Sequence, residues 1–355
     1  MQWRKDWEAA AGSFAPVAPP QHPTYDVYAV IDMALAEDAG DYGDISTLST
    51  VPEGTQARAT FLAKASGVLA GVWVAHAVFA RVDPSVGLSW ARKDGDRVQP
   101  GEILGEARGS ARSILVAERV ALNFLQRMSG IASLTRQMVD AVQGTPSTVL
   151  ETRKTVPCLR LLDKWAVLIG GGQNHRIGLY DMVMIKDNHI AAAGGIAAAV
   201  AGTEEYQRSK GIRRPVEVET RTLAELKELL AILDAAGPDT MVTRIMLDNM
   251  TKKDAGAPSG LDVSTLREAM QLIGDRRIET EASGNVTLDT VRVIAETGVQ
   301  FISCGALTHS VTALDISLNI ETQRMQPPAG ALPAGPAAVN ALDAFEGTSM
   351  PCGSA

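Results

Sequence analysis

The sequence has few cysteines and few aromatic residues, and it shows no excess of basic charge. Its three cysteines, Cys158, Cys304 and Cys352, have neither CxxC nor CxxH spacing, so the pattern indicates neither a disulfide framework nor a zinc site. The chain carries 33 Lys and Arg against 41 Asp and Glu, and only 5% of its residues are aromatic. Nucleic-acid binding usually needs a basic balance or aromatic platforms, so we expect no nucleic-acid partner.

Long apolar runs are absent as well. No run approaches the roughly 20 residues that a membrane-spanning helix needs, so we expect no membrane partner. Residues 1–22 lack the continuous apolar core of a signal peptide and include Asp6 and Glu8, which argue against a transit peptide. We expect a disordered leader there and the cytoplasm as the default compartment. Residues 326–355 are rich in Pro, Gly and Ala, which predicts a disordered tail.

The second part of the sequence repeats one pattern, a short apolar run that ends at a polar residue or a glycine. The runs end at Arg153-Lys154, Lys186, Glu219, Asp248, Ser283-Gly284 and Cys304-Gly305. Helical patterns separate them, and one begins with the capping-box spacing of Thr222 and Glu225. Alternating strands and helices predict parallel βα units, with the site where the strands end. We predict an incomplete (β/α) barrel of about six to seven strands over residues 136–310, with an open doubly wound sheet as the alternative.

The first part, residues 23–135, reads as a smaller α+β domain. Residues 25–38 have a helical pattern, residues 57–63 alternate as a strand, and residues 88–105 contain turn-rich short β segments. A long amphipathic pattern from Ser113 to Val142 predicts a helix that links the two domains. Residues 311–325 are expected to return to the first domain.

A group of cationic side chains lies in an apolar, glycine-rich stretch of this acidic chain. Its members are Arg153, Lys154, His175, Arg176 and Lys186. Such a group predicts a site for small, multiply charged anions. His175 taken alone could be a satisfied core histidine. Lys186 could instead form a Schiff base in an aldolase, but an aldolase would not require Arg153, Arg176 and Glu219 together.

Several segments together carry a family resemblance. They are ERVALNFLQRMSGIASLT, ETRKT followed by LRLLDKWAV, GGGQNHRIGLYDMVMIKDNHI, VEVETRT, RIMLDNM, EASGNVTLDTV and ISCGALTHSVTALDISL. Over residues 22–322 the sequence resembles the quinolinate phosphoribosyltransferases, also called carboxylating nicotinate-nucleotide pyrophosphorylases. The segments KWAVLIGGG and DMVMIKDNHI resemble the green plant and algal branch of the family. This resemblance makes the plastid and the mitochondrion alternatives to the cytoplasm. Cys158 occupies a position where the family usually has glycine. This departure affects the expected geometry of the local turn, not the expected activity.

The resemblance implies an enzyme of NAD biosynthesis. It would transfer the phosphoribosyl group of phosphoribosyl pyrophosphate to quinolinate and release pyrophosphate and carbon dioxide, with Mg²⁺ as cofactor. By resemblance the dicarboxylate is held by four residues, Arg119, Arg153, His175 and Arg176. Arg119 would come from the neighbouring subunit, which implies a homodimer.

The remaining roles are also implied by resemblance. Phosphate groups would be contacted by Lys154, Lys186, Ser283, Gly284, Asn285 and Gly305, while His309 either lines the phosphate region or caps the next helix. Glu219 and Asp248 would stabilise positive charge on the ribose and help to hold Mg²⁺. Glu219, Asp248 and Lys154 are therefore the catalytic candidates.

Single features of the sequence separate the phosphoribosyl transfer to quinolinate from alternative functions. The chain has no Asp-Asp pair, which excludes the common nucleotide-salvage phosphoribosyltransferase fold. A nicotinate phosphoribosyltransferase, a related molybdenum-locus protein and a catalytically silent phosphosugar- or quinolinate-binding module stay as alternatives. The full set of cations favours a dicarboxylate substrate, and the presence of Glu219 and Asp248 favours an enzyme.

Overall fold

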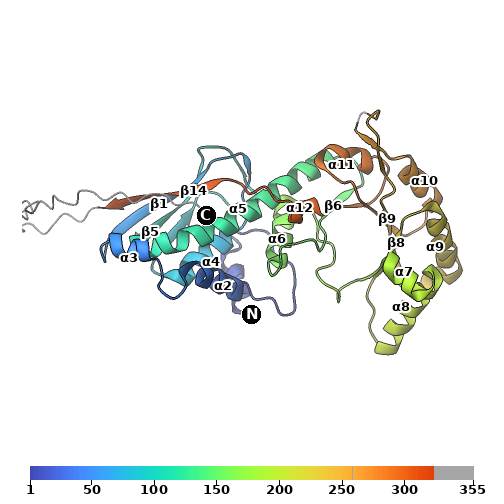
Figure 1. Ribbon diagram of the computed structural model, residues 1–355, viewed down its shortest axis with the longest axis horizontal. Helices are drawn as coiled ribbons and strands as arrows, with labels where there is room; N and C mark the ends of the chain where they lie inside the picture. The colour runs from blue at the N-terminus through green and yellow to red at the C-terminus, as the bar shows by residue number, and fades with distance from the viewer. Residues whose placement is uncertain (258, 324–355) are drawn as a thin grey trace, which may run out of the picture. The chain divides into compact units, whose positions relative to one another are not determined.

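The computed structural model of the chain describes residues 1–257 and 259–323 (Figure 1). The tail predicted for residues 326–355 lies outside the described residues. In the described part of the chain, no helix is both long and apolar enough to cross a membrane.

The N-terminal part is built around a four-stranded antiparallel sheet with strand order β14-β1-β5-β3. Its strands are β1 (Gln56–Ala63), β3 (Gly87–Trp90), β5 (Ile103–Ser110) and β14 (Ile316–Gln323), and β2 (Gly67–Val68) pairs separately with β4 (Arg97–Val98). In β1 the alternate residues Ala57, Ala59, Phe61 and Ala63 are buried, as the predicted period of two requires. Helices α2 (Val27–Ala39), α3 (Ile45–Thr50) and α4 (Val72–Val82) complete this α+β domain.

Strand β14 comes from the far end of the described chain. All eight of its residues pair with β1, from Gln56 opposite Gln323 to Ala63 opposite Ile316. Just before this strand, the chain passes very close to Gly130, where a Cβ atom would overlap the carbonyl group of Thr312. A glycine is needed there because the two backbones touch.

The first residues do not form the disordered leader that was predicted. Residues Gln2–Ala10 form helix α1, and Trp3 is fully buried with its ring centroid 6.0 Å from that of Trp73. Trp7 packs edge-on against Trp165 at 6.3 Å, and the indole nitrogen of Trp165 donates to the carbonyl of Val17. The prediction was wrong because the segment is stabilised by Trp3 and Trp7, whose partners Trp73 and Trp165 lie far away in the sequence. Its charged residues gave no sign of this packing.

Helix α5 (Ala111–Ala141) links the two parts of the fold (Figure 1). It begins at Ser110, whose hydroxyl accepts a hydrogen bond from the backbone nitrogen of Ser113. It packs against α4 and β14 of the N-terminal part and against α6 (Arg160–Gly170) and α11 (Leu288–Ala295). The predicted linking helix is confirmed.

The C-terminal part contains six parallel strands in the order β6-β13-β12-β9-β8-β7. They are β6 (Thr148–Leu150), β7 (Val183–Ile185), β8 (Val216–Thr220), β9 (Val242–Asp248), β12 (Glu279–Ser283) and β13 (Phe301–Ser303). From β7 to β13, each new strand lies beside the one before it, and β6 adjoins β13. A doubly wound sheet would reverse its direction at a switch point, so that alternative is excluded. The order is the one expected of a (β/α) barrel opened between β6 and β7.

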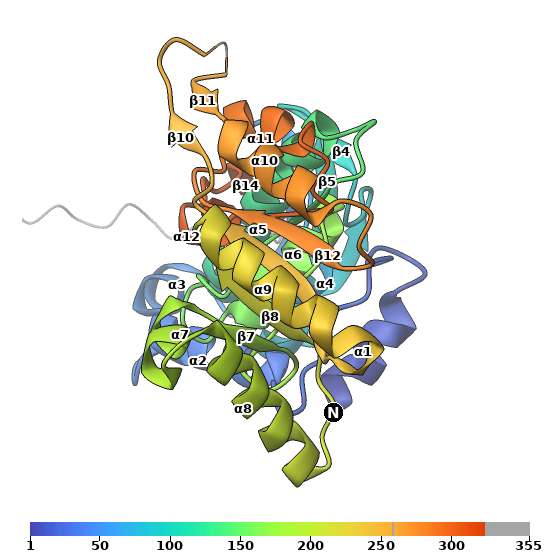
Figure 2. The same cartoon turned by 90° about the vertical axis from the view of Figure 1, so that its right-hand side faces the viewer.

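Helices connect these strands along one face. They are α7 (Asp187–Ala193), α8 (Ile196–Lys210), α9 (Leu223–Ala236), α10 (Ser264–Ile273) and α11, followed by the short α12 (Ala306–His309). Figure 2 shows α8, α9 and α10 following one another across the outer side of the sheet. The predicted capping box is present at the start of α9, where Thr222 and Glu225 bond each other's backbone nitrogens at 3.1 Å. A one-turn 3-10 helix (Gly237–Asp239) and the β10–β11 hairpin (Lys252–Lys253, Leu261–Asp262) complete the described elements.

Candidate active site

A cavity of about 500 Å³ lies at the carboxyl ends of the parallel strands. Most of the charged residues predicted for the site line it. The lining residues are Thr152, Arg153, Lys154, His175, Arg176, Met184, Lys186, Glu219, Met246, Asp248, Asn249, Glu281, Ser283 and Ser303. Each of the six parallel strands thus contributes lining residues from its carboxyl-terminal half or from just beyond its end.

The lining is arranged in two layers because side chains alternate along a strand. Met184, Met246 and Glu281 form a lower layer, and each is followed two residues later by a residue of the upper layer. The upper residues are Lys186, Asp248 and Ser283, and Glu219 joins them from β8. Polar groups therefore gather at the rim, while the lower layer is largely buried.

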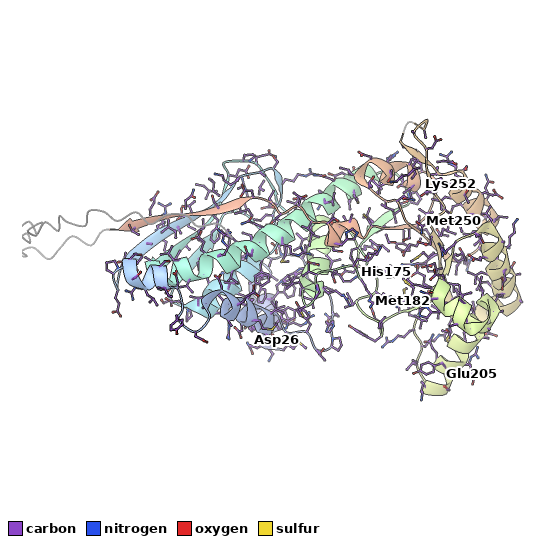
Figure 3. All side chains as sticks on the ribbon, viewed as in Figure 1. Asp26, His175, Met182, Glu205, Met250 and Lys252 are labelled. Atoms are coloured by element: carbon purple, nitrogen blue, oxygen red, sulfur yellow. The ribbon has the colours of Figure 1, made fainter. Side chains whose placement is uncertain are left out.

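Two of the cations that line the cavity are held by contacts within the protein. Lys186 Nζ lies 2.5 Å from Glu219 Oε2, which ties the end of β7 to that of β8. Arg176 donates from Nη1 to the carbonyl of Met182 at 3.3 Å, and Figure 3 shows His175 and Met182 in the space between α6 and β8. Burial, together with the charge of Arg153, lowers the pKa of Arg176. Two guanidinium groups that repel each other in one cavity are suited to an anion with two negative groups.

Two carboxylates line the same cavity as the cations. Glu219 and Asp248 come from the neighbouring strands β8 and β9. Burial and the negative charge of Glu219 raise the pKa of Asp248, although Asn249 donates to its carboxylate at 2.7 Å. A hard cation with oxygen ligands, such as Mg²⁺, would relieve this repulsion, so the two residues fit a magnesium site.

A buried charge cluster adjoins the cavity, and two of its members, His175 and Glu281, also line it. The sequence predicted only His175. His175 Nε2 lies 3.0 Å from Glu217 Oε2 and 3.2 Å from Glu281 Oε2, and both carboxylates are fully buried. Burial alone would lower the pKa of His175, but Glu217 and Glu281 outweigh it and raise that pKa to about 9. Arg244 Nη1 reaches Glu281 at 3.2 Å from the strand between them. The signal that could have revealed Glu217 was the Glu-x-Glu spacing of β8, which puts Glu217 and Glu219 on one face.

A second buried pair fixes the loop that carries His175 and Arg176. Lys164 on α6 pairs with Glu151 and also donates to the carbonyl of His175 at 3.0 Å. Glu151 in turn accepts from the backbone of His175 and from the side chain of Asn174, both at 3.0 Å. Because both charges are fully buried, removing one partner would leave an uncompensated charge. A lysine inside the otherwise apolar face of α6 was the available signal.

The predicted phosphate-binding turns lie at the ends of β12 and β13 but, apart from Ser283, do not line the cavity. Gly284 has a φ of +95°, and a Cβ atom there would collide with Asn249, which does line it. Asn285 adopts the left-handed conformation at φ 55° and donates to Thr251. A Cβ atom on Gly305 would lie 3.0 Å from Lys154 Cδ and 3.1 Å from His309 Cδ2, so this glycine makes room for both side chains.

Arg119 is not brought to the cavity within this chain. It is exposed on α5 and lines a separate cavity beside Asp44, Ile45 and other residues of α2 and α3. Its predicted role in a neighbouring subunit's site stays a prediction.

Known proteins resemble the chain along most of its length. Residues 131–319 match the family model described as the C-terminal domain of quinolinate phosphoribosyl transferase, and residues 44–129 match that of its N-terminal domain. The chloroplastic nicotinate-nucleotide pyrophosphorylase [carboxylating] of Arabidopsis thaliana is 58% identical over 307 residues, 86% of each chain. The mitochondrial quinolinate phosphoribosyltransferase [decarboxylating] 2a of Nicotiana tabacum is 54% identical over 307 residues, also 86% of each chain. The crystal structure of NadC from Streptococcus pyogenes, 37% identical, superposes with a TM-score of 0.74 over 86% of this chain and 99% of its own.

Proposed function

The chain belongs to the quinolinate phosphoribosyl transferase family, and on that premise we propose that it makes nicotinate mononucleotide from quinolinate and phosphoribosyl pyrophosphate. Pyrophosphate and carbon dioxide are the other products, and the reaction serves NAD biosynthesis. One observation supports this most directly. Arg153, Lys154, Arg176 and Lys186 line a single cavity together with Glu219 and Asp248.

The cations bind the substrates. Arg153 and Arg176 pair with the two carboxylates of quinolinate, because a guanidinium can bind a carboxylate through two parallel hydrogen bonds. The family resemblance adds Arg119 of a second subunit and His175 to this set. Lys154, Lys186 and the turns at Ser283-Gly284-Asn285 and Gly305 contact the phosphate groups, and His309 lies beside Gly305.

The carboxylates act on the ribose. Departure of pyrophosphate leaves positive charge at the ribose carbon, and Glu219 and Asp248 stabilise that charge. The same two residues would hold Mg²⁺, and the ion would help to neutralise the negative charge of the departing pyrophosphate. Catalysis then consists mainly of positioning and electrostatics.

Decarboxylation follows from the chemistry of the ring. Once the pyridine nitrogen is bonded to ribose, the ring accepts the electron pair of the breaking carbon–carboxylate bond. Carbon dioxide leaves and the ring carbon takes up a proton. No residue has to form a covalent bond with the substrate.

The assembly and the compartment are part of this proposal. Because Arg119 lies outside the cavity of its own chain, we place it in the site of a partner subunit, so that the active form is at least a homodimer. The names of the two plant relatives place them in the chloroplast and the mitochondrion, which favours an organelle over the cytoplasm for this chain.

An assay of the purified protein with three pyridine substrates tests the function. Quinolinate, nicotinate and nicotinamide are each supplied with phosphoribosyl pyrophosphate and Mg²⁺, and carbon dioxide and mononucleotide are followed together. With quinolinate the two products should form in equal amounts, and chelation of Mg²⁺ should stop turnover. With nicotinate, kcat/KM should fall at least about tenfold, because a buried cation then loses its carboxylate partner.

Two variants serve as controls in the same assay. Arg153→Ala should lose nearly all activity, whereas Arg208→Ala, which removes an exposed arginine on α8, should retain it. Comparable efficiency with nicotinate and quinolinate would refute the dicarboxylate assignment. Formation of mononucleotide from nicotinate alone would favour the monocarboxylate alternative.

A further inference from the structure

The loop after β6, which carries Arg153 and Lys154 into the cavity, is held at its backbone by two other elements. The carbonyl of Lys154 accepts a hydrogen bond of 2.8 Å from the hydroxyl of Thr308 on α12. The backbone nitrogen of Val156 donates to Asp163 Oδ2 on α6 at 3.2 Å. Both side chains are buried, so these bonds are shielded from water. The position of the loop therefore depends on where α6 and α12 present these two groups.

One arginine joins the two groups. Arg127 on α5 donates from Nε and Nη2 to the two carboxylate oxygens of Asp163, each at 2.9 Å, and Nη2 also donates to the carbonyl of Thr308 at 2.9 Å. Helices α5, α6 and α12 contact one another at this place (Figure 1). Burial raises the pKa of Asp163, and the hydrogen bonds and charge of Arg127 oppose that rise. A planar guanidinium offers several donors in fixed directions, which a lysine does not.

The side chain of Lys154 is guided by the same region. A Cβ atom on Gly305 would lie 3.0 Å from Lys154 Cδ, so the stem of the lysine runs closely over this glycine. Gly305 directly precedes α12, which carries Thr308. This segment thus contacts Lys154 twice, at its carbonyl and along its stem, before the side chain reaches the cavity. A shift of α12 relative to the loop would move the ammonium group within the cavity.

We infer that Arg127 is a positioning residue, which holds the loop of Arg153 and Lys154 in place through the carboxylate on α6 and the carbonyl on α12. Arg127 does not itself line the cavity. The inference rests on the proposed function for the substrates that the two loop cations bind. A small displacement of a group that binds a reacting substrate can cost a large factor in rate. Changes to Arg127 and its partners should therefore reduce catalysis without touching a substrate.

Removal of one hydroxyl tests the hold on Lys154. Thr308→Val keeps the shape of the side chain but leaves the carbonyl of Lys154 without its donor. We expect KM for phosphoribosyl pyrophosphate to rise and kcat/KM to fall about tenfold or more, whereas Thr308→Ser, which keeps the hydroxyl, should restore most of the loss. Thr135→Val is the matched control, because Thr135 is equally buried and its hydroxyl donates to the carbonyl of Ile131 within α5. It should keep the kcat/KM of the unchanged protein.

A change of Arg127 tests the joint between the two helices. Arg127→Lys keeps the positive charge but cannot hold both oxygens of Asp163 and the carbonyl of Thr308 at once. We expect kcat/KM to fall about tenfold or more here as well. Arg81→Lys is the control, because Arg81 forms the same two-bond contact with Asp32, at 2.8 and 2.7 Å, and does not line the cavity. A purely stabilising role would lower the amount of folded enzyme and leave KM unchanged.

Amide hydrogen exchange reports on the loop without any substrate. Mass spectrometry of a peptide that covers residues 152–157 follows the amide of Val156, whose acceptor is Asp163. In the Arg127→Lys protein this peptide should exchange about tenfold faster or more, while the Arg81→Lys protein should match the unchanged protein.

The outcomes separate this inference from the proposed function. Unchanged KM and kcat/KM in folded Arg127→Lys and Thr308→Val proteins would overturn the inference and leave the function intact. So would equal losses in Thr308→Val and Thr135→Val, or unchanged loop exchange in Arg127→Lys. If Arg127→Lys fails to fold, Thr308→Val decides, because it removes only one hydrogen bond. A protein that never turns over quinolinate would refute the function, while the exchange measurement would still decide whether Arg127 holds the loop.

Discussion

At the scale of single residues, Cys158 shows how a departure from a family pattern is accommodated. Its φ of 64° lies in the left-handed region, where a side chain is unfavourable and glycine is not. The hydroxyl of Tyr25 donates to its carbonyl at 2.6 Å, which holds the turn in place. The sequence could identify the departure, but the dihedral angle explains why glycine is the usual residue.

Replacing Cys158 should therefore increase stability. Cys158→Gly removes the strain of the left-handed conformation, and we expect the free energy of unfolding to rise by about 1 kcal/mol. Urea denaturation followed by fluorescence measures the change, and activity should not alter. Cys158→Ala is the control, since alanine keeps a Cβ atom and gives no such relief. Equal stability of the two variants would contradict the explanation.

Several of the site residues that the sequence predicted follow apolar runs. Lys186, Glu219 and Asp248 were found because parallel strands end at one rim, and the structure places all three in the lining. Glu281 and Lys164 were missed because a charged residue within a strand or helix usually marks a solvated face. Only the fold reveals that they are buried, since their partners His175 and Glu151 come from other elements.

At the scale of elements, the strands were more predictable than the first residues of the chain. Six predicted segments correspond to six observed strands, because short, largely apolar segments that end at a polar residue or a glycine are typical of buried parallel strands. Helix α1 was not predicted, because its stability depends on Trp73 and Trp165, which no local pattern can supply. Tertiary contacts decide such a segment rather than helix propensity.

Two glycines inside helices should respond oppositely to alanine. Gly130 on α5 faces the carbonyl of Thr312, so Gly130→Ala forces two backbones apart and should lower the free energy of unfolding by about 2 kcal/mol or more. Gly202 on α8 has no atom within 4 Å of the place that a Cβ atom would occupy, so Gly202→Ala should raise it by about 0.5–1 kcal/mol. Thermal unfolding of both proteins provides the comparison. A gain for Gly130→Ala would show that the contact with Thr312 does not matter, and a loss for Gly202→Ala would contradict the open space around that position.

At the scale of the whole molecule, the exposed position of Arg119 leads to a test of subunit cooperation. Arg119→Ala and Lys154→Ala proteins should each be nearly inactive. If Arg119 serves the partner's site, each mixed dimer has one complete site, and random exchange should restore about a quarter of the original activity. Activity measured before and after exchange, with differently tagged subunits to prove mixing, checks this. A mixture of Arg153→Ala and Lys154→Ala is the control, because both changes affect the same site and should give no recovery.

Strand β14 has a consequence for how the protein is made. The ribosome releases β1 early, but its partner strand emerges only after the whole six-stranded sheet has been synthesised. At ordinary rates of translation, β1 waits on the order of ten seconds or more with one edge uncovered. An uncovered edge can pair with another chain. The N-terminal domain therefore cannot finish folding first, and the nascent chain is most prone to aggregate in the interval before residues 316–323 arrive.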